Sequence, residues 1–335
     1  PVMPNRPVDD CFFTDQDRLT HREALELIAA RVEPVGASEP VALRDALGRI
    51  AATTVAAPRP VPGHANAAVD GYAFASGDYD PAAGARLPVA GRAAAGTPLA
   101  GHPPPGTAVR IFTGAVIPDG LDSVAMQEDV RLEPDGATTF ARLPAGLKAG
   151  ANRRKAGEDL AAGDPIVTAG QRLRPQEIAG LASAGIAQLA CRMPVEVALV
   201  SSGDEVVPLG QELLPGQVHD ANAPMLEALV GTTGARPNPI GILRDDRALV
   251  RSALSEAALT SDLIISSGGA SQGEEDHIAT ALAEIGHRHL WQIAVKPGRP
   301  MLFGQIGRCL YLGLPGNPVA VFVCFLLYAR PLIRR

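Results

Sequence analysis

Aromatic residues are scarce in this sequence, which has one Trp, four Tyr and eight Phe among its 335 residues. Its hydrophobic cores must therefore be built mainly from Ala, Val, Leu and Ile. Apolar residues as a whole are plentiful at 46%, and a chain of this length can bury a substantial core. Disorder over the whole chain is thus excluded, and the length alone predicts about two domains.

Lysine and net positive charge are also lacking. Only Lys148, Lys155 and Lys296 occur, and 30 basic against 36 acidic residues give a net charge of −6. Proteins that bind nucleic acids in general carry a basic face, so we expect no nucleic-acid partner. Each of the few lysines becomes a candidate for a specific role.

Cysteine is rare as well, and long apolar runs are absent. The four cysteines lie far apart with no C-x-x-C pair, which excludes the usual zinc ribbon and a dense disulfide framework. The longest apolar run, 319–329, is shorter than the ~20 helical residues that span a bilayer, and no signal segment opens the chain. We expect a cytoplasmic protein with reduced thiols and no membrane partner.

The pattern of residues changes along the chain. A capping box at Thr20–Glu23, followed by apolar residues at helical spacing, predicts a helix over about 20–32. Pro175 and Gly185 are typical of the start and end of a second helix. Between them, residues 58–148 carry frequent Pro and Gly turns, which predicts a small all-β domain. From 194 onward, strand patterns alternate with helix patterns, which predicts βαβ units and a parallel sheet.

Gly-containing loops follow three of the predicted strands, at Ser201–Glu205, Ser267–Asp276 and Leu314–Pro318. Ligands bind beyond the carboxyl ends of such strands, and loops of this kind let backbone N–H groups approach an anion. Any one of these loops alone is also consistent with an ordinary tight turn. Three at one sheet edge favour an anion-binding site.

Acidic residues accompany these loops, namely Glu205, Asp220 and Asp276. Carboxylates beside an anion need a bridging hard cation, and magnesium takes one or two carboxylates together with phosphate oxygens and water. The alternative is that acids at 274–276 only complement a helix dipole. Lys296 and Arg299 share a stiff loop, which suits them to bind an oxyanion.

Two further motifs have alternative interpretations. Residues 269–273 match G-x-S-x-G with Ser271 as a nucleophile, but the triad base and the oxyanion loop that serine hydrolysis needs are not evident in the sequence, so we disfavour it. The basic cluster 153–155 is also consistent with a solvated connector. Asp70-Gly71 alone is typical of a hairpin turn.

Taken together, nine segments resemble the molybdopterin molybdenumtransferase family, which includes bacterial MoeA and the E domain of gephyrin. The resemblance runs from about residue 18 to the end of the chain. Its first motif departs mildly, with Ala67-Ala68-Val69 where Ser and Met are common. The segments are 66–72 (NAAVDGY), 110–115 (RIFTGA), 122–128 (DSVAMQE), 154–159 (RKAGED), 201–205 (SSGDE), 220–222 (DAN), 267–276 (SGGASQGEED), 296–300 (KPGRP) and 313–318 (GLPGNP).

The resemblance implies an elongated α/β multi-domain protein. Its parts would be a helical/β linker domain made of 18–57 and 149–190, an inserted β-rich domain at 58–148, and a molybdopterin-binding, MogA-like three-layer α/β domain at 191–335. Family members continue into a small C-terminal β domain, which we expect this chain to lack. The resemblance also implies a homodimer.

The activity implied is insertion of molybdenum from molybdate into adenylyl-molybdopterin, with release of AMP and with Mg²⁺ as the divalent cation. A molybdopterin adenylyltransferase would be the upstream partner. Two alternatives stay open. The chain could be a catalytically impaired molybdopterin-binding scaffold, or it could be a molybdopterin adenylyltransferase itself.

The resemblance also implies roles for individual residues. Asp276 and Asp220 would hold the metal and, with Glu205, Asp70 and Thr113, carry the catalytic roles. The substrate-binding residues implied are Lys296, Arg299, Arg154, Asp159, Ser202, Gly203, Gly268, Gly269, Ser271, Gly316 and Asn317.

Overall fold

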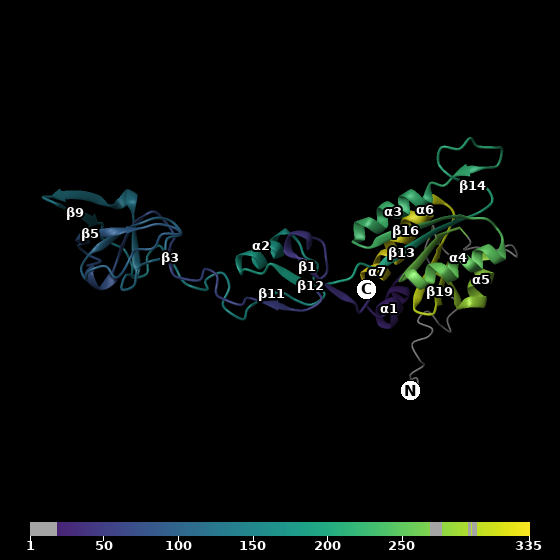
Figure 1. Ribbon diagram of the computed structural model, residues 1–335, viewed down its shortest axis with the longest axis horizontal. Helices are drawn as coiled ribbons and strands as arrows, with labels where there is room; N and C mark the ends of the chain where they lie inside the picture. The colour runs from purple at the N-terminus through teal and green to yellow at the C-terminus, as the bar shows by residue number, and fades with distance from the viewer. Residues whose placement is uncertain (1–18, 269–276, 294–295, 297–299) are drawn as a thin grey trace, which may run out of the picture. The chain divides into compact units, whose positions relative to one another are not determined.

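The computed structural model describes residues 19–268, 277–293, 296 and 300–335 (Figure 1). The chain divides into two compact units. The α/β unit combines the N-terminal segment up to Glu39 with Arg192–Arg335, and the inserted unit is Pro40–Cys191. Among the described residues, no helix is both long and apolar enough to cross a membrane.

The α/β unit is built on a six-stranded sheet whose first four strands are parallel, and the fifth strand runs antiparallel to both of its neighbours. Ser267 lies opposite Ser201 on one side and Leu314 on the other, so three parallel strands end level. This agrees with the predicted parallel sheet. The strand order is β16 (Arg236–Leu243), β13 (Glu196–Ser202), β17 (Leu263–Ser267), β20 (Cys309–Leu314), β19 (Pro300–Ile306) and β18 (His287–Gln292).

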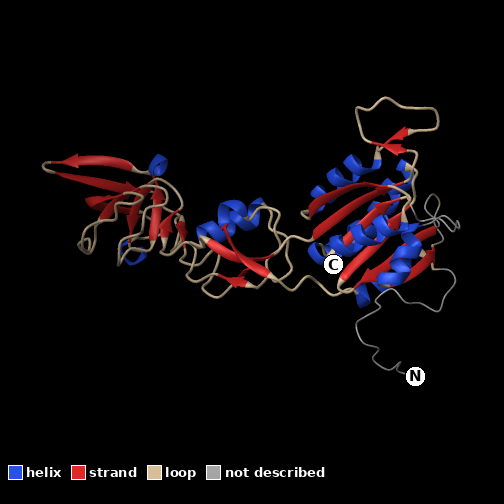
Figure 2. Ribbon diagram, turned by 45° about the vertical axis from the view of Figure 1, so that its right-hand side comes forward, coloured by secondary structure: helices blue, strands red, loops and turns tan. Residues whose placement is uncertain are grey.

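Helices cover both faces of this sheet and make three layers (Figure 2). Successive residues of β13 alternate between the two cores: Val197 belongs to one hydrophobic cluster and Ala198 to the other, as expected for a strand buried on both faces. The helices are α3 (Asn222–Thr233), α4 (Arg247–Thr260), α5 (His277–Ile285), α6 (Pro318–Cys324), a π-helical turn η4 (Phe325–Ala329) and α7 (Arg330–Arg334).

Helix α1 (His21–Arg31) begins with the predicted capping box of Thr20 and Glu23, so this expected helix is confirmed. Its buried residues Ala24 and Ile28 belong to the same hydrophobic cluster as Phe325 of the α/β unit, and the His21 ring lies against Tyr328 with Nδ1 3.1 Å from the hydroxyl. The resemblance grouped this helix with the linker segment 18–57. The structure places it with the α/β unit, because its apolar face is buried in that core.

The inserted unit contains a second six-stranded sheet. Strands β5 and β6 run parallel, and the other neighbours are antiparallel. Its two faces bury separate apolar clusters, one around Ile111 and the other around Phe74. The strand order is β7 (Ser123–Met126), β4 (Gly71–Phe74), β6 (Ala108–Ile111), β5 (Ala85–Ala93), β9 (Thr138–Leu143) and β8 (Arg131–Asp135), with 3₁₀ turns η2 (Ser76–Asp78) and η3 (Gln127–Asp129).

The rest of the inserted unit is a smaller assembly around helix α2 (Pro175–Ser183), which begins at Pro175 as predicted. Its core includes Leu173, Leu181 and Leu189. The remaining elements of this part are β1 (Ser38–Ala42) paired with β12 (Gln188–Arg192), β2 (Val55–Ala56) paired with β11 (Pro165–Val167), β3 (Asn66–Ala67) paired with β10 (Arg153–Arg154), and η1 (Leu43–Asp45). The division of this unit into separate linker and β-rich domains remains a prediction.

Candidate functional site

The carboxyl ends of β13, β17 and β20 bring five predicted substrate-binding residues to one edge of the α/β sheet. The Gly268 amide donates to the Leu314 carbonyl at 3.1 Å, which ties the ends of β17 and β20 together. Gly268 has φ +90°, and a Cβ there would lie 2.7 Å from the Ser202 carbonyl oxygen, so the close approach of β13 and β17 requires glycine. The five residues are Ser202, Gly203, Gly268, Gly316 and Asn317.

Glu205 and Asp220 are joined to this edge by a small parallel pair, β14 (Val206–Val207) and β15 (Val218–His219). Glu205 immediately precedes β14 and is exposed, and its carbonyl accepts from the Val218 amide at 2.8 Å. Asp220 immediately follows β15 and is only 8% exposed. The pairing therefore holds two of the predicted acidic residues at the two ends of one short ribbon.

The Asp220 carboxylate contacts the N-terminus of α3. Its Oδ1 accepts from the backbone amides of Asn222 at 3.1 Å and Ala223 at 3.0 Å. These amides are among those that a helix leaves without internal partners. Asp220 thus has a structural role at the helix terminus, an interpretation that the sequence favoured less for Asp220 than for the acids at 274–276.

Asn222 links the start of α3 to the loop that follows β20. Its Nδ2 donates to the Gly316 carbonyl at 2.8 Å, and the next residue of that loop, Asn317, caps α6 through bonds from Val319 and Ala320. The Oδ1 of Asn222 is buried and has no hydrogen-bond partner within the described ranges. Asn222 belongs to the Asp220–Asn222 motif, but its contact with Gly316 could not be predicted because it spans 94 positions in the sequence.

In the inserted unit, the predicted residues Asp70 and Thr113 are in direct contact. Asp70 Oδ1 accepts from the Thr113 backbone amide at 2.8 Å and from Thr113 Oγ1 at 2.7 Å. These two hydrogen bonds, with the backbone one first, hold the pKa of Asp70 below its ordinary value, and the charge of Arg110 adds to the effect. Asp70 is therefore firmly ionised at neutral pH.

Arg154 and Asp159, two further predicted substrate-binding residues, are also in direct contact. Arg154 Nη2 donates to Asp159 Oδ1 at 2.5 Å, and its Nε lies 3.4 Å from Glu158 Oε1. The bond to Asp159, followed by that to Glu158, raises the pKa of the Arg154 guanidinium. Backbone pairing places Arg154 opposite Asn66, the first residue of the motif that ends near Asp70.

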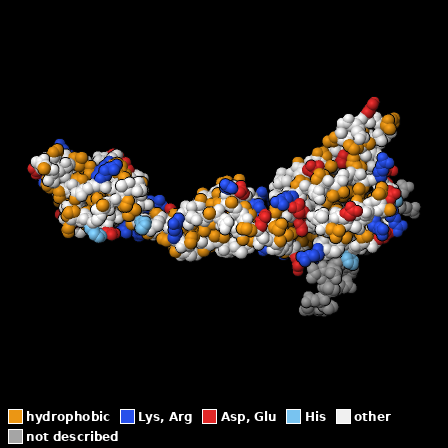
Figure 3. Space-filling view, viewed as in Figure 1, with side chains coloured by type: hydrophobic (Ala, Val, Ile, Leu, Met, Phe, Trp, Pro, Cys, Tyr) orange, Lys and Arg blue, Asp and Glu red, His pale blue; other side chains and the backbone are white. Residues whose placement is uncertain are grey.

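The remaining predicted residues divide into two groups. Lys296 is exposed, which leaves its ammonium accessible. Asp276, Gly269, Ser271 and Arg299 lie outside the described residues. Within the part of the chain that is described, no three His, Cys, Asp or Glu side chains converge as a metal site. Basic and acidic side chains are interspersed over the viewed face (Figure 3).

Two family models match the sequence. One, described as the MoeA N-terminal region (domain I and II), matches residues 19–185. The other, described as a probable molybdopterin binding domain, matches residues 199–335. Together they match most of both units.

Curated relatives are named molybdopterin molybdenumtransferase. The protein of Haemophilus influenzae is 40% identical over 88% of this chain and 71% of its own length. The protein of a Nostoc species is 38% identical over 89% of this chain and 69% of its own length. Among solved structures, a molybdopterin biosynthesis MoeA protein from Pyrococcus horikoshii matches with a TM-score of 0.81 and 32% identity, covering 95% of this chain and 80% of that one.

Proposed function

Because this chain belongs to the molybdopterin molybdenumtransferase family, we propose that it inserts molybdenum from molybdate into adenylyl-molybdopterin and releases AMP. It is a transferase of molybdenum cofactor biosynthesis. We further propose that it acts as a homodimer in the cytoplasm and receives its substrate from a molybdopterin adenylyltransferase.

One observation in the α/β unit carries this proposal. Three Gly-containing strand ends and the N-terminus of α3 meet at one sheet edge, and Asn222 joins two of them through Gly316. Glycine lets backbone amides approach an anion closely, and the dipole of α3 favours negative charge at its start. An edge of this kind supports binding of a phosphate-bearing substrate such as adenylyl-molybdopterin.

The residues at this edge fit a magnesium ion. Mg²⁺ prefers oxygen ligands and keeps several waters, so one or two carboxylates suffice. Asp220 uses Oδ1 for the α3 amides, which leaves its second oxygen as a candidate ligand. The buried acceptor Asn222 Oδ1, which has no partner among the described residues, suits a water of such an ion. We propose Asp220 and Asp276 as the residues that would hold it.

When bound, the cation would neutralise the charge that builds up as phosphate and molybdate approach each other. The chain's own residues would orient the two anions. We propose that Lys296 and Arg299 bind anionic substrate, that Arg154 does so while Asp159 holds its guanidinium in place, and that Asp70 acts as a fixed carboxylate oriented by Thr113. Such positioning lowers the barrier mainly through orientation and preorganised charge, without a covalent nucleophile.

The test is to incubate the purified chain with adenylyl-molybdopterin, molybdate and Mg²⁺. We expect AMP release that requires molybdate, together with a product that activates a molybdenum enzyme lacking its cofactor. Tight binding without AMP release would instead identify a scaffold. Consumption of ATP and unmodified molybdopterin with release of pyrophosphate would identify an adenylyltransferase. Either result would refute the proposal.

A further inference from the structure

Two arginines lie side by side on the sheet of the inserted unit. Arg92 on β5 is in register with Arg110 on β6, and Arg110 is in register with Tyr72 on β4. Phe112 follows β6 directly, and its ring centroid lies 4.5 Å from the guanidinium carbon of Arg92 and 4.6 Å from that of Arg110. One aromatic ring is thus in contact with two guanidinium groups.

The two guanidiniums differ in how firmly they are held. Arg110 donates from Nη1 to the Gly71 carbonyl at 3.0 Å and from Nη2 to Gln127 Oε1 at 2.6 Å, and it also stacks over Tyr72. These hydrogen-bond partners are uncharged, and the ionised Asp70 feels the charge of Arg110 without forming an ion pair with it. Arg92 is exposed, and within the described ranges no carboxylate forms an ion pair with either arginine.

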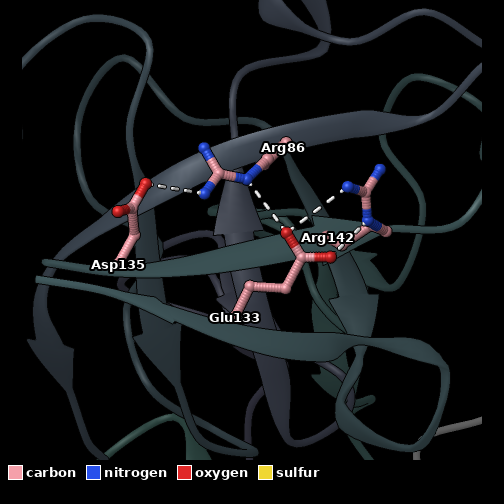
Figure 4. Close-up of polar contacts among 4 residues, drawn as sticks. All are labelled: Arg86, Glu133, Asp135 and Arg142. Atoms are coloured by element: carbon pink, nitrogen blue, oxygen red, sulfur yellow. Dashed lines mark hydrogen bonds and ion pairs between the residues drawn. The ribbon is translucent and has the colours of Figure 1, made fainter.

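A second arginine–aromatic pair in the same sheet shows the contrast. The guanidinium carbon of Arg86 lies 3.6 Å from the centroid of the Phe140 ring, but Arg86 also pairs with Glu133 at 2.9 Å and with Asp135 at 3.2 Å. Arg142 shares the Glu133 carboxylate (Figure 4). In that cluster each arginine forms an ion pair with a carboxylate, whereas neither Arg92 nor Arg110 does so within the described ranges.

Like charges directly opposite each other on neighbouring strands destabilise a sheet. Here two such charges lie together: hydrogen bonds fix one of them, and both stack on one ring. The arrangement is therefore suited to bind an anion from outside the described chain. A guanidinium presents a planar fork of donors that matches oxyanions such as phosphate. Arg92 retains its full set of donors for this purpose.

The position of the pair supports the same conclusion. Phe112 immediately precedes Thr113, and Gly71, whose carbonyl holds Arg110, immediately follows Asp70. The pair therefore lies at the same end of β4 and β6 as the Asp70–Thr113 contact. We propose that Arg92 and Arg110, held by Phe112, form a binding site for a tetrahedral oxyanion, either a phosphate group or molybdate. The choice of these two anions rests on the proposed function.

Binding can be measured directly by isothermal titration of the full chain with sodium molybdate and, in a separate arm, with inorganic phosphate and AMP. Low ionic strength is required because salt screens exposed charges. We expect Arg92→Gln to weaken binding of the preferred oxyanion about tenfold, as loss of one charge-assisted contact does. The Arg92 side chain makes no hydrogen bond within the described chain, so this change spares the backbone pairing of β5 with β6.

Arg131→Gln is the matched control, because Arg131 is an exposed arginine of the same sheet and its loss changes the net charge equally. Unchanged affinity in Arg92→Gln, or an equal loss in both variants, would overturn the proposal. If Arg92→Gln keeps its oxyanion affinity but changes the oligomeric state, the proposal also fails, because Arg92 would then contact another protein chain and not an anion. If oxyanion binding depends on Arg92 but the chain does not release AMP, only the proposed activity is refuted.

Discussion

Asp70 Oδ1 accepts two hydrogen bonds from one residue, Thr113, through its backbone amide and its hydroxyl. The contact joins the turn before β4 to the turn after β6, which are antiparallel neighbours in the sheet. Each turn alone is typical of an ordinary hairpin. Their contact converts two unremarkable segments into one fixed, ionised carboxylate at the end of the sheet.

This contact predicts how the Asp70 carboxyl titrates. Thr113→Ala removes the hydroxyl donor and keeps the backbone donor, so we expect the pKa of Asp70 to rise in the variant while staying below its ordinary value of 3.8. A carboxyl ¹³C NMR titration measures this. Thr113→Ser, which keeps a hydroxyl, is the control and should titrate like the parent. Identical pKa values in the parent and Thr113→Ala would show that the hydroxyl bond does not form in solution.

Substitution of Gly71 and of Gly77 by alanine should affect the stability of the inserted unit very differently. A Cβ at Gly71 would lie 1.9 Å from the Ala125 carbonyl oxygen, whereas at Gly77 nothing lies within 4 Å. Gly71→Ala should therefore destabilise the inserted unit by about 3 kcal/mol, the upper end of the usual range for overpacking. Gly77→Ala should change stability by no more than about 0.5 kcal/mol. Urea unfolding of both variants tests this, and similar midpoints would contradict the close packing of β4 and β7.

Much of the fold could be predicted from local pattern. The capping box at Thr20 and the proline at 175 marked the starts of α1 and α2, and the alternation of strands and helices after 194 predicted the parallel sheet. The pattern could not tell which core the apolar face of α1 joins. Ile28 is equally apolar whichever surface buries it, and only the tertiary packing settles that it contacts the α/β unit.

The candidate site, too, could be predicted only in part from the sequence. Ser202, Gly268 and Gly316 could be placed at one edge because the ends of parallel strands meet there. The contact from Asn222 to Gly316 could not, since it depends on how α3 packs beside a loop that is remote in sequence. The grouping of Arg92 with Phe112 depends on strand order and register, which composition does not specify.

The proposed role of Asp220 can be separated from its contact with the helix. Asp246 holds the N-terminus of α4 in the same manner, with Oδ1 accepting from Ala248 and Leu249. Asparagine is as good a capping residue as aspartate, so Asp220→Asn and Asp246→Asn should each cost no more than about 1 kcal/mol of stability. Only Asp220→Asn should lower kcat/KM for AMP release, by roughly 10²-fold if its charge acts on the reacting anions. Equal activity in the two variants would reduce Asp220 to a structural residue.

Glu177 predicts an acid-sensitive contribution to the stability of α2. Its side chain is 7% exposed, and its carboxylate accepts from the Arg174 side chain and from the Arg174 amide at 2.9 Å. The side-chain bond is the main reason that its pKa falls from 4.5 to about 2. Because the pKa is lowered by folding, the stabilisation is present above pH 4.5 and is lost as the pH falls towards 2.

Glu177→Gln should therefore speed amide hydrogen exchange in α2 relative to the parent at pH 6, and this difference should shrink below pH 4.5. Glu26→Gln is the charge-matched control. Glu26 forms a surface ion pair with Arg22 and its side chain is 68% exposed, and such pairs contribute little to stability. Exchange in α1 should accordingly change little in Glu26→Gln. If the difference in α2 exchange rate between Glu177→Gln and the parent persists unchanged at pH 3, packing and not the ionised carboxylate holds the start of α2.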